Sequence, residues 1–182
     1  MPENSRLLEP SPLVKKFGST IADAAFGYPI IDVACGSGRN AFYLAEFGSN
    51  VICVDRDLTR LKKELPAQTV SPRLTLFEMD LLADPWPFGP HTIGGIVLVD
   101  FLNLSLFALF ERSLIAGGYL LIETVSGRGG NYLELPKASE LRTALEKSFD
   151  FCVYREVKVG PRASNAVTVR LLARRRATEP RV

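Results

Sequence analysis

Segments typical of buried strands alternate with segments typical of helices along most of the chain. Short runs rich in β-branched and other apolar residues end at turn residues, and they predict strands over 29–34, 50–55, 74–79, 93–99 and 119–125. Helical segments are expected between them at 39–47, 57–65 and 102–115. Because parallel neighbours need crossover connections, this alternation predicts an α/β protein with a mostly parallel sheet covered on both faces.

The C-terminal part predicts a different kind of pairing. After a helix at 139–149, two strands at 151–159 and 166–172 are separated by Gly160 and Pro161, close enough to pair as a hairpin. Such a hairpin makes one edge of the sheet antiparallel. A chain of 182 residues suits a single core, since one domain usually takes about 100–200 residues. We expect that domain to span 29–173, after an N-terminal segment at 1–28 and before a basic, solvated tail at 174–182.

Composition excludes several classes of function. A formal net charge of +2 is too balanced for a chain that coats nucleic acid or anionic lipid, which argues against a nucleic-acid partner. Cys35, Cys53 and Cys152 are far apart and odd in number, which predicts neither disulfides nor a metal site. The most apolar stretch contains Asp100 and Asn103, so it predicts buried strand and helix rather than a membrane span. With no export signal visible, the expected location is cytoplasmic.

Polar or glycine residues follow three of the predicted strands. In doubly wound sheets the ligand lies beyond the carboxyl ends of the strands. Gly36 and Gly38 follow the first strand and let a ligand approach the start of a helix. Asp55 ends the second strand, where a carboxylate can accept both hydroxyls of a ribose, and Asp80 ends the third. Together they predict an adenosine-containing ligand.

Alternative interpretations remain for each of these residues. The glycines can form an ordinary strand-to-helix turn, and Asp55 can cap the following helix. Residues 36–41 also fit the GxGxxA fingerprint of dinucleotide-binding proteins. Asp32, however, would place a negative charge near a pyrophosphate, whereas a sulfonium with an ammonium group would favour it.

Three segments resemble the motifs of class I S-adenosylmethionine-dependent methyltransferases. Residues 30–40, 51–57 and 77–81 are similar to the first, second and third motifs of that family. Residues 38–40, Gly-Arg-Asn, and the segment 117–124 resemble the small bacterial tellurite-resistance-type methyltransferases. The likeness extends over roughly residues 11–173 and implies a single Rossmann-like, doubly wound sheet of seven strands. Its implied strand order is 3-2-1-4-5-7-6, with strand 7 antiparallel and helices on both faces.

The resemblance also implies a cofactor site for S-adenosylmethionine, with S-adenosylhomocysteine as product. The N-terminal segment resembles a helix that covers the cofactor, from which Lys16 would meet the methionyl carboxylate. Arg56 stands where the family often has an apolar residue, and its guanidinium can stack on adenine instead. The expected cofactor-binding residues are Lys16, Asp32, Ala34, Cys35, Gly36, Gly38, Asp55, Arg56, Asp80, Leu81 and Val99.

Methyl transfer from a sulfonium is an in-line displacement that mainly requires positioning, so no catalytic side chain is obligatory. Asp100 is the expected base if one is needed, with Glu123 as a second candidate; His91 is placed at the opposite edge of the sheet. We expect a small-molecule acceptor beside Phe101, Asn103 and Tyr132. A non-catalytic binding module and an NAD-dependent oxidoreductase are the alternatives, and the sequence leaves the oligomeric state open.

Overall fold

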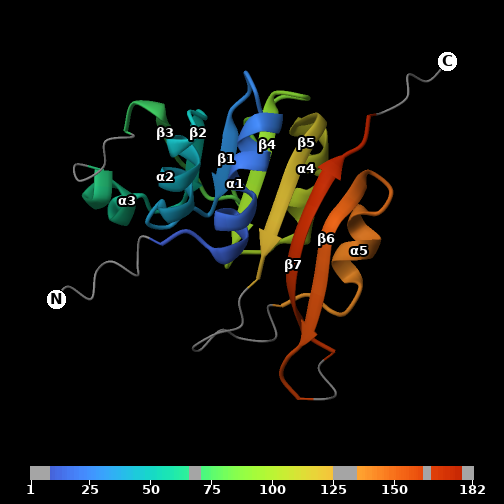
Figure 1. The fold of residues 1–182 in the computed structure, drawn as a ribbon. Helices are drawn as coiled ribbons and strands as arrows, with labels where there is room; N and C mark the ends of the chain where they lie inside the picture. The colour runs from blue at the N-terminus through green and yellow to red at the C-terminus, as the bar shows by residue number, and fades with distance from the viewer. Residues whose placement is uncertain (1–8, 66–70, 125–134, 162–164, 178–182) are drawn as a thin grey trace.

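The computed structural model describes residues 9–65, 71–124, 135–161 and 165–177 (Figure 1). These residues form a seven-stranded sheet in the order β3-β2-β1-β4-β5-β7-β6, which confirms the predicted order. The strands, in chain order, are β1 Ile30–Val33, β2 Val51–Asp55, β3 Leu74–Glu78, β4 Ile93–Val99, β5 Leu114–Glu123, β6 Phe149–Lys158 and β7 Val167–Arg175.

The strand register brings the carboxyl ends of the parallel strands to one edge of the sheet. Asp32 of β1 pairs with Cys53 of β2 on one side and with Val97 of β4 on the other, both in parallel. The antiparallel neighbour is β7, in which Arg170 pairs with Glu123 of β5. The residues that follow β1, β2, β3 and β4 therefore lie near one another, as a ligand site at this edge requires.

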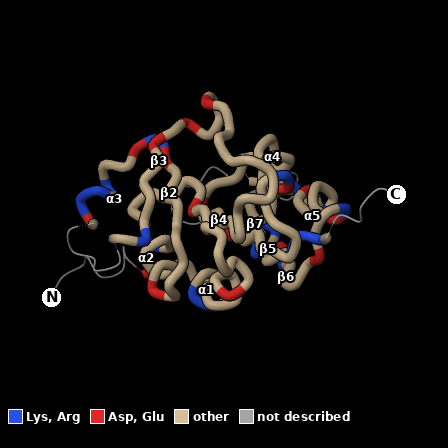
Figure 2. The backbone as a smooth tube through the Cα atoms, turned by 90° about the horizontal axis from the view of Figure 1, so that it is seen from above, with Lys and Arg blue, Asp and Glu red and all other residues tan. Residues whose placement is uncertain are grey.

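Helices cover both faces of the sheet, and Figure 2 shows α1 and α2 on one side with α4 on the other. The first face carries α1 Pro12–Ala24, α2 Arg39–Glu46 and α3 Thr59–Glu64, and the second carries α4 Phe107–Ser113 and α5 Glu140–Leu145. Neighbouring residues of a strand point to opposite faces, so Ile30 packs in the α1 core and Ile31 in the α4 core. Among the described residues, no helix is both long and apolar enough to cross a membrane.

The helix expected at 102–115 is shorter than predicted. A 3-10 turn, η4 at Leu104–Leu106, leads into α4, and β5 already begins at Leu114. Ile93 pairs with Leu114, and the register then shifts before Gly95 meets Tyr119. A Cβ on Gly118 would lie 2.7 Å from the carbonyl oxygen of Gly94, so this irregular pairing requires a glycine. The helix expected at 139–149 likewise ends early, because β6 begins at Phe149.

The basic run that begins at Arg174 is not a solvated tail, and that expectation is wrong for its first residues. β7 continues to Arg175, whose side chain is only 7% exposed. Its Nε donates to the carbonyl oxygen of Glu111 at 3.1 Å, and its guanidinium lies 3.6 Å from the Glu111 carboxylate. Arg176 follows with an ion pair to Asp150 at 2.8 Å. These acceptors compensate for the burial of the Arg175 charge, which sequence patterning alone does not reveal.

Candidate functional site

The turn between β1 and α2 adopts left-handed backbone conformations at three positions. Ala34, Gly36 and Gly38 have φ angles of 54°, 56° and 79°. Gly38 is also the N-cap of α2, and a Cβ there would lie 2.9 Å from Cδ1 of Leu61. Glycine at position 38 is therefore required both by the backbone angle and by the close approach of α3.

Asp55 connects this glycine turn to the end of β2. Its Oδ2 accepts a hydrogen bond from the backbone N–H of Gly36 at 2.8 Å, and its Oδ1 accepts from the N–H of Asp57 at 3.1 Å. The side chain that accepts from the start of the next helix is Asp57, whose Oδ1 receives the N–H of Thr59 at 2.8 Å. Hydrogen bonding to the Thr59 side chain, and then to the Thr59 N–H, lowers the pKa of Asp57. Asp55 thus faces the glycine turn, and the side chain that accepts from the first residue of α3 is that of Asp57, although the N-cap position itself is Leu58.

A pocket of about 260 Å³ lies beside Asp55 at the carboxyl edge of the sheet. Its walls combine carboxylates and one guanidinium with apolar side chains, a lining suited to a flat aromatic ring with polar edges. Six of its residues are predicted site residues; Met79 and Leu82 are additional, and their only sequence signal is that they flank Asp80 and Leu81. The lining residues are Ala34, Asp55, Arg56, Met79, Asp80, Leu81, Leu82 and Phe101.

Asp80 forms a tight turn at one side of this pocket. Its Oδ1 accepts the N–H of Leu82 at 2.9 Å, and its own N–H donates to Oδ2 of Asp84 at 2.8 Å. The carbonyl oxygen of Asp80 accepts the N–H of Asp84 at 2.8 Å. The turn fixes the position of the Asp80 carboxyl group beside the pocket.

Two predicted residues, Asp32 and Cys35, lie beneath the glycine turn in buried positions. Burial raises the pKa of Asp32 to about 7, although its Oδ2 accepts the N–H of Ala41 at 3.1 Å. A hydrogen bond with Cys53, followed by burial, raises the pKa of the Cys35 thiol. Cys35 and Cys53 are therefore core thiols, whereas Asp32 changes its charge near neutral pH.

Asp100, the expected base, follows the buried Val99 at the end of β4 with a φ angle of 60°. Its Oδ2 lies 3.2 Å from Nη2 of Arg39, the first residue of α2. A second guanidinium nitrogen of Arg39 donates to the carbonyl oxygen of Glu9 at 3.5 Å. The candidate base thus belongs to an ion pair that joins β4, α2 and the N-terminal segment; sequence reasoning missed Arg39 as a site residue.

Glu123, the second candidate base, has both carboxylate oxygens engaged by the protein. It is 1% exposed. Its Oε1 accepts from Nε of Arg170 at 2.8 Å, and its Oε2 accepts from the N–H of Leu13 at 3.2 Å. These contacts make Glu123 an anchor for α1 and β7, and a role as base is not the one that its contacts indicate.

The remaining predicted residues lie apart from the pocket or outside the described residues. Lys16 is on the exposed side of α1, with its Nζ 5.1 Å from the centroid of the Phe17 ring. Asn103 uses its Oδ1 to accept from the N–H of Ser105 at 2.9 Å, which caps η4. Tyr132 lies outside the described residues.

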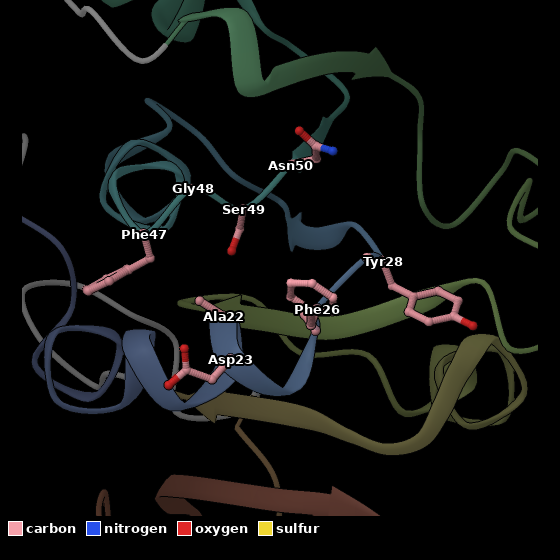
Figure 3. A pocket seen from close by; sticks show the side chains of 10 residues that line it. Ala22, Asp23, Phe26, Tyr28, Phe47, Gly48, Ser49 and Asn50 are labelled. Carbon is pink, nitrogen blue, oxygen red and sulfur yellow. The ribbon is translucent and has the colours of Figure 1, made fainter.

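The opposite, amino edge of the sheet holds a second pocket, of about 360 Å³ (Figure 3). It lies between the connection from α1 to β1, with Phe26 and Tyr28, and the connection from α2 to β2, with Phe47. None of the predicted site residues lines it. His91 also lies away from the site, just before β4, with its Nδ1 3.2 Å from the carbonyl oxygen of Leu114.

Across the described ranges, no group of three or more His, Cys, Asp or Glu side chains is placed to hold a metal ion. The carboxyl edge carries the glycine turn, the carboxylates of Asp55 and Asp80, and the Arg39–Asp100 ion pair.

Comparison with protein families gives one match that spans this edge of the sheet. The family model of the methyltransferase domain matches residues 31–122, about half of the chain. The match runs from β1 to β5 and includes the glycine turn, Asp55, Asp80 and Asp100. No curated protein sequence matches the chain.

Solved structures share the fold at low sequence identity. A SAM dependent methyltransferase from Aquifex aeolicus is 18% identical with a TM-score of 0.65, covering 94% of this chain and 93% of its own. A geranyl diphosphate methyltransferase, in complex with GPP and sinefungin, is 14% identical with a TM-score of 0.65. The match covers 90% of this chain and 78% of that one. The tRNA (m1A58) methyltransferase of Aquifex aeolicus is 12% identical with a TM-score of 0.63. The match covers 92% of this chain and 70% of that one.

Proposed function

The chain belongs to the methyltransferase domain family, whose methyl donor is S-adenosylmethionine, and we propose that it methylates a small-molecule acceptor. The observation that carries the cofactor half of this proposal is the Asp55 carboxylate, held against Gly36 beside the pocket of about 260 Å³. A carboxylate at the end of the second strand is suited to accept ribose hydroxyls.

The residues at the carboxyl edge fit an adenosine-containing sulfonium cofactor. Leu81, Met79 and Phe101 offer apolar walls for adenine, and Asp80 is placed to accept from its exocyclic amine. The left-handed turn at Gly36 and Gly38 lets the backbone approach the ligand closely. Asp32 supplies a buried carboxyl group, and a cationic group that binds nearby stabilises its ionised form. Lys16 is proposed to meet the methionyl carboxylate.

S-Adenosylmethionine supplies an activated methyl group when bound, so the protein mainly has to position the acceptor. We place the acceptor beside Phe101 and Asn103, with Tyr132 as a further wall. Asp100 is the group that would hold or remove a proton from an oxygen or nitrogen nucleophile, in the orientation set by Arg39. In this arrangement Asp100 is a candidate catalytic residue and Arg39 positions it.

Charge supports a small acceptor over a long polyanion. The net charge is +2, and acidic and basic residues are interspersed over the view of Figure 2. A polyanion-binding protein needs several clustered cations, because phosphate contacts dominate its affinity. The fold alone is compatible with either acceptor, since solved structures of similar fold include a geranyl diphosphate methyltransferase and a tRNA methyltransferase.

The acceptor class is tested by supplying S-adenosylmethionine with a labelled methyl group to four fractions: RNA, DNA, protein extract and small metabolites. We expect label in the metabolite fraction, and Asp100→Asn should reduce its rate. Label found only in macromolecules would contradict the small-molecule proposal. Cofactor binding without transfer to any fraction would favour the alternative of a non-catalytic binding module.

A further inference from the structure

The segment that leads into α1 is fastened to the protein at three points. We call residues 9–13 the N-terminal strap. The carbonyl oxygen of Glu9 accepts from Arg39 at 3.5 Å, the N–H of Ser11 donates to Oδ1 of Asn40 at 2.9 Å, and the N–H of Leu13 donates to Oε2 of Glu123 at 3.2 Å. All three contacts are made by the strap backbone, so they fix its path.

Two of the fastening side chains are buried polar groups from separate elements. Asn40 is 4% exposed in the first turn of α2, and Glu123 is 1% exposed at the last position of β5. Burying an amide or a carboxylate is unfavourable unless each polar atom finds a partner. The strap supplies partners for both, and Arg170 supplies the second partner of Glu123.

The strap therefore crosses the carboxyl edge of the sheet. α2 follows β1, and the sheet places β4 between β1 and β5. A segment joined to the start of α2 and to the end of β5 passes the ends of β1 and β4, where Asp32 and Asp100 lie in or directly after the strands. The adenosine pocket lies on the other side of the glycine turn, beside β2 and β3, and no strap residue lines it.

The start of α1 makes this attachment stable. Ser11 is the N-cap, and its Oγ accepts the N–H of Val14 at 3.2 Å, while Pro12 occupies the first helical position. The Glu123 carboxylate accepts the N–H of Leu13 in the first turn, where negative charge is favourable to a helix. Removing the carboxylate would loosen the strap at the point where the helix begins.

We propose that Asn40 and Glu123 are positioning residues that hold the N-terminal strap as a wall of the methionine half of the cofactor site. This inference rests on the proposed function. A ligand that fills the methionine half gains from a wall that is already ordered, because it does not have to order that segment on binding. A ligand that fills only the adenosine half depends on Asp55 and Asp80 and does not need the strap.

The experiment compares two ligands on the same protein samples. S-Adenosylhomocysteine contains the amino-acid part, whereas 5′-methylthioadenosine keeps the adenosine and the thioether without it. Calorimetry is performed on wild type, Asn40→Ala, Glu123→Ala and Glu123→Gln. The matched control is Ser113→Ala, which removes a buried hydroxyl that accepts from Trp86 Nε1 at 2.9 Å near the amino edge.

We expect the two alanine variants to weaken S-adenosylhomocysteine binding by about 10-fold or more, the scale of a lost buried hydrogen bond. Binding of 5′-methylthioadenosine should change by less than about twofold in the same variants, because this ligand lacks the part that the strap would contact. Glu123→Gln keeps an oxygen for the Leu13 N–H and should lose less affinity than Glu123→Ala. Ser113→Ala should change neither ligand.

Equal weakening of both ligands in the alanine variants would overturn the inference, because it would indicate a general effect on the fold. Unchanged binding of both ligands would overturn it as well. Where an alanine variant does not fold, Asn40→Ser, which shortens the side chain that accepts the Ser11 N–H, gives the same comparison. If wild type binds neither ligand, the proposed function is wrong and the inference falls with it.

Discussion

Asp55 and Gly36 are 19 positions apart in the sequence and are joined by a hydrogen bond of 2.8 Å from the Gly36 N–H to Oδ2 of Asp55. This bond links the end of β2 to the turn that follows β1. It orients the Asp55 carboxylate toward the glycine turn and keeps it only half-buried, which leaves it accessible to a ligand in the neighbouring pocket.

Replacing Asp55 tests its part in cofactor binding. Asp55→Ala is expected to weaken S-adenosylhomocysteine binding by about 2–4 kcal/mol, because two charge-assisted hydrogen bonds to ribose are lost together. The matched control is Asp57→Ala, which removes the same charge two positions away and leaves the Asp55–Gly36 bond in place. Calorimetry measures both; unchanged affinity in folded Asp55→Ala would assign Asp55 a purely structural role.

Gly38 and Gly48 form a matched pair for a test of the glycine turn. Both have a left-handed φ, 79° and 83°, but a Cβ on Gly38 would lie 2.9 Å from Leu61, whereas a Cβ on Gly48 would meet nothing within 4 Å. Gly48→Ala is expected to lower the free energy of unfolding by about 1–2 kcal/mol, from backbone strain alone. Gly38→Ala should cost about 1–3 kcal/mol more from overpacking. Equal losses in urea unfolding would show that Leu61 adjusts freely.

Asp32 predicts a specific pH dependence of stability. Its pKa is raised by burial from 3.8 to about 7 in the folded protein. Because the folded protein binds this proton more tightly than the unfolded chain does, protonation of Asp32 stabilises the fold. The stabilisation is complete below the unfolded-state pKa of 3.8 and is lost as the pH rises through about 7. Between pH 5 and pH 8 the wild type should therefore lose about 2–3 kcal/mol relative to Asp32→Asn. Urea unfolding of both proteins at these two pH values measures the difference; parallel curves would contradict the raised pKa.

The raised pKa of Asp32 also predicts that ligand binding is coupled to the release of a proton. A cationic amino group near Asp32 favours the ionised carboxylate, so S-adenosylhomocysteine should bind more tightly as the pH rises from 6 to 8. At pH 6 binding should release protons, measured as a difference between the heats in two buffers of different ionisation enthalpy. Asp32→Asn should abolish that difference. An unchanged difference in the variant would place the released proton elsewhere.

The glycine turn, Asp55 and Asp80 were predictable because each is tied to the end of a strand by local sequence. The seven-strand order followed from the family resemblance, and the structure confirms it. The likeness to tellurite-resistance-type methyltransferases stays a prediction, as do the roles assigned to Lys16 and Tyr132.

Other features depend on contacts that local sequence does not encode. Glu123 looked like a base at a strand end, but its partners Leu13 and Arg170 are 110 and 47 positions away. Arg175 looked like part of a charged tail, yet carbonyl groups of Glu111 and Ser148 stabilise it within the sheet. In both cases polar partners that are distant in the sequence allow a charged side chain to be buried. The periodicity of apolar residues along the chain does not identify those partners.

We propose that the carboxyl edge of this sheet binds S-adenosylmethionine. Titration calorimetry of the wild-type protein with S-adenosylhomocysteine and, separately, with NAD tests it most directly, with each ligand taken to about 1 mM, where a millimolar dissociation constant still gives measurable binding. We expect saturable, one-to-one binding of S-adenosylhomocysteine and no heat from NAD. Binding of NAD with no heat from S-adenosylhomocysteine would contradict it.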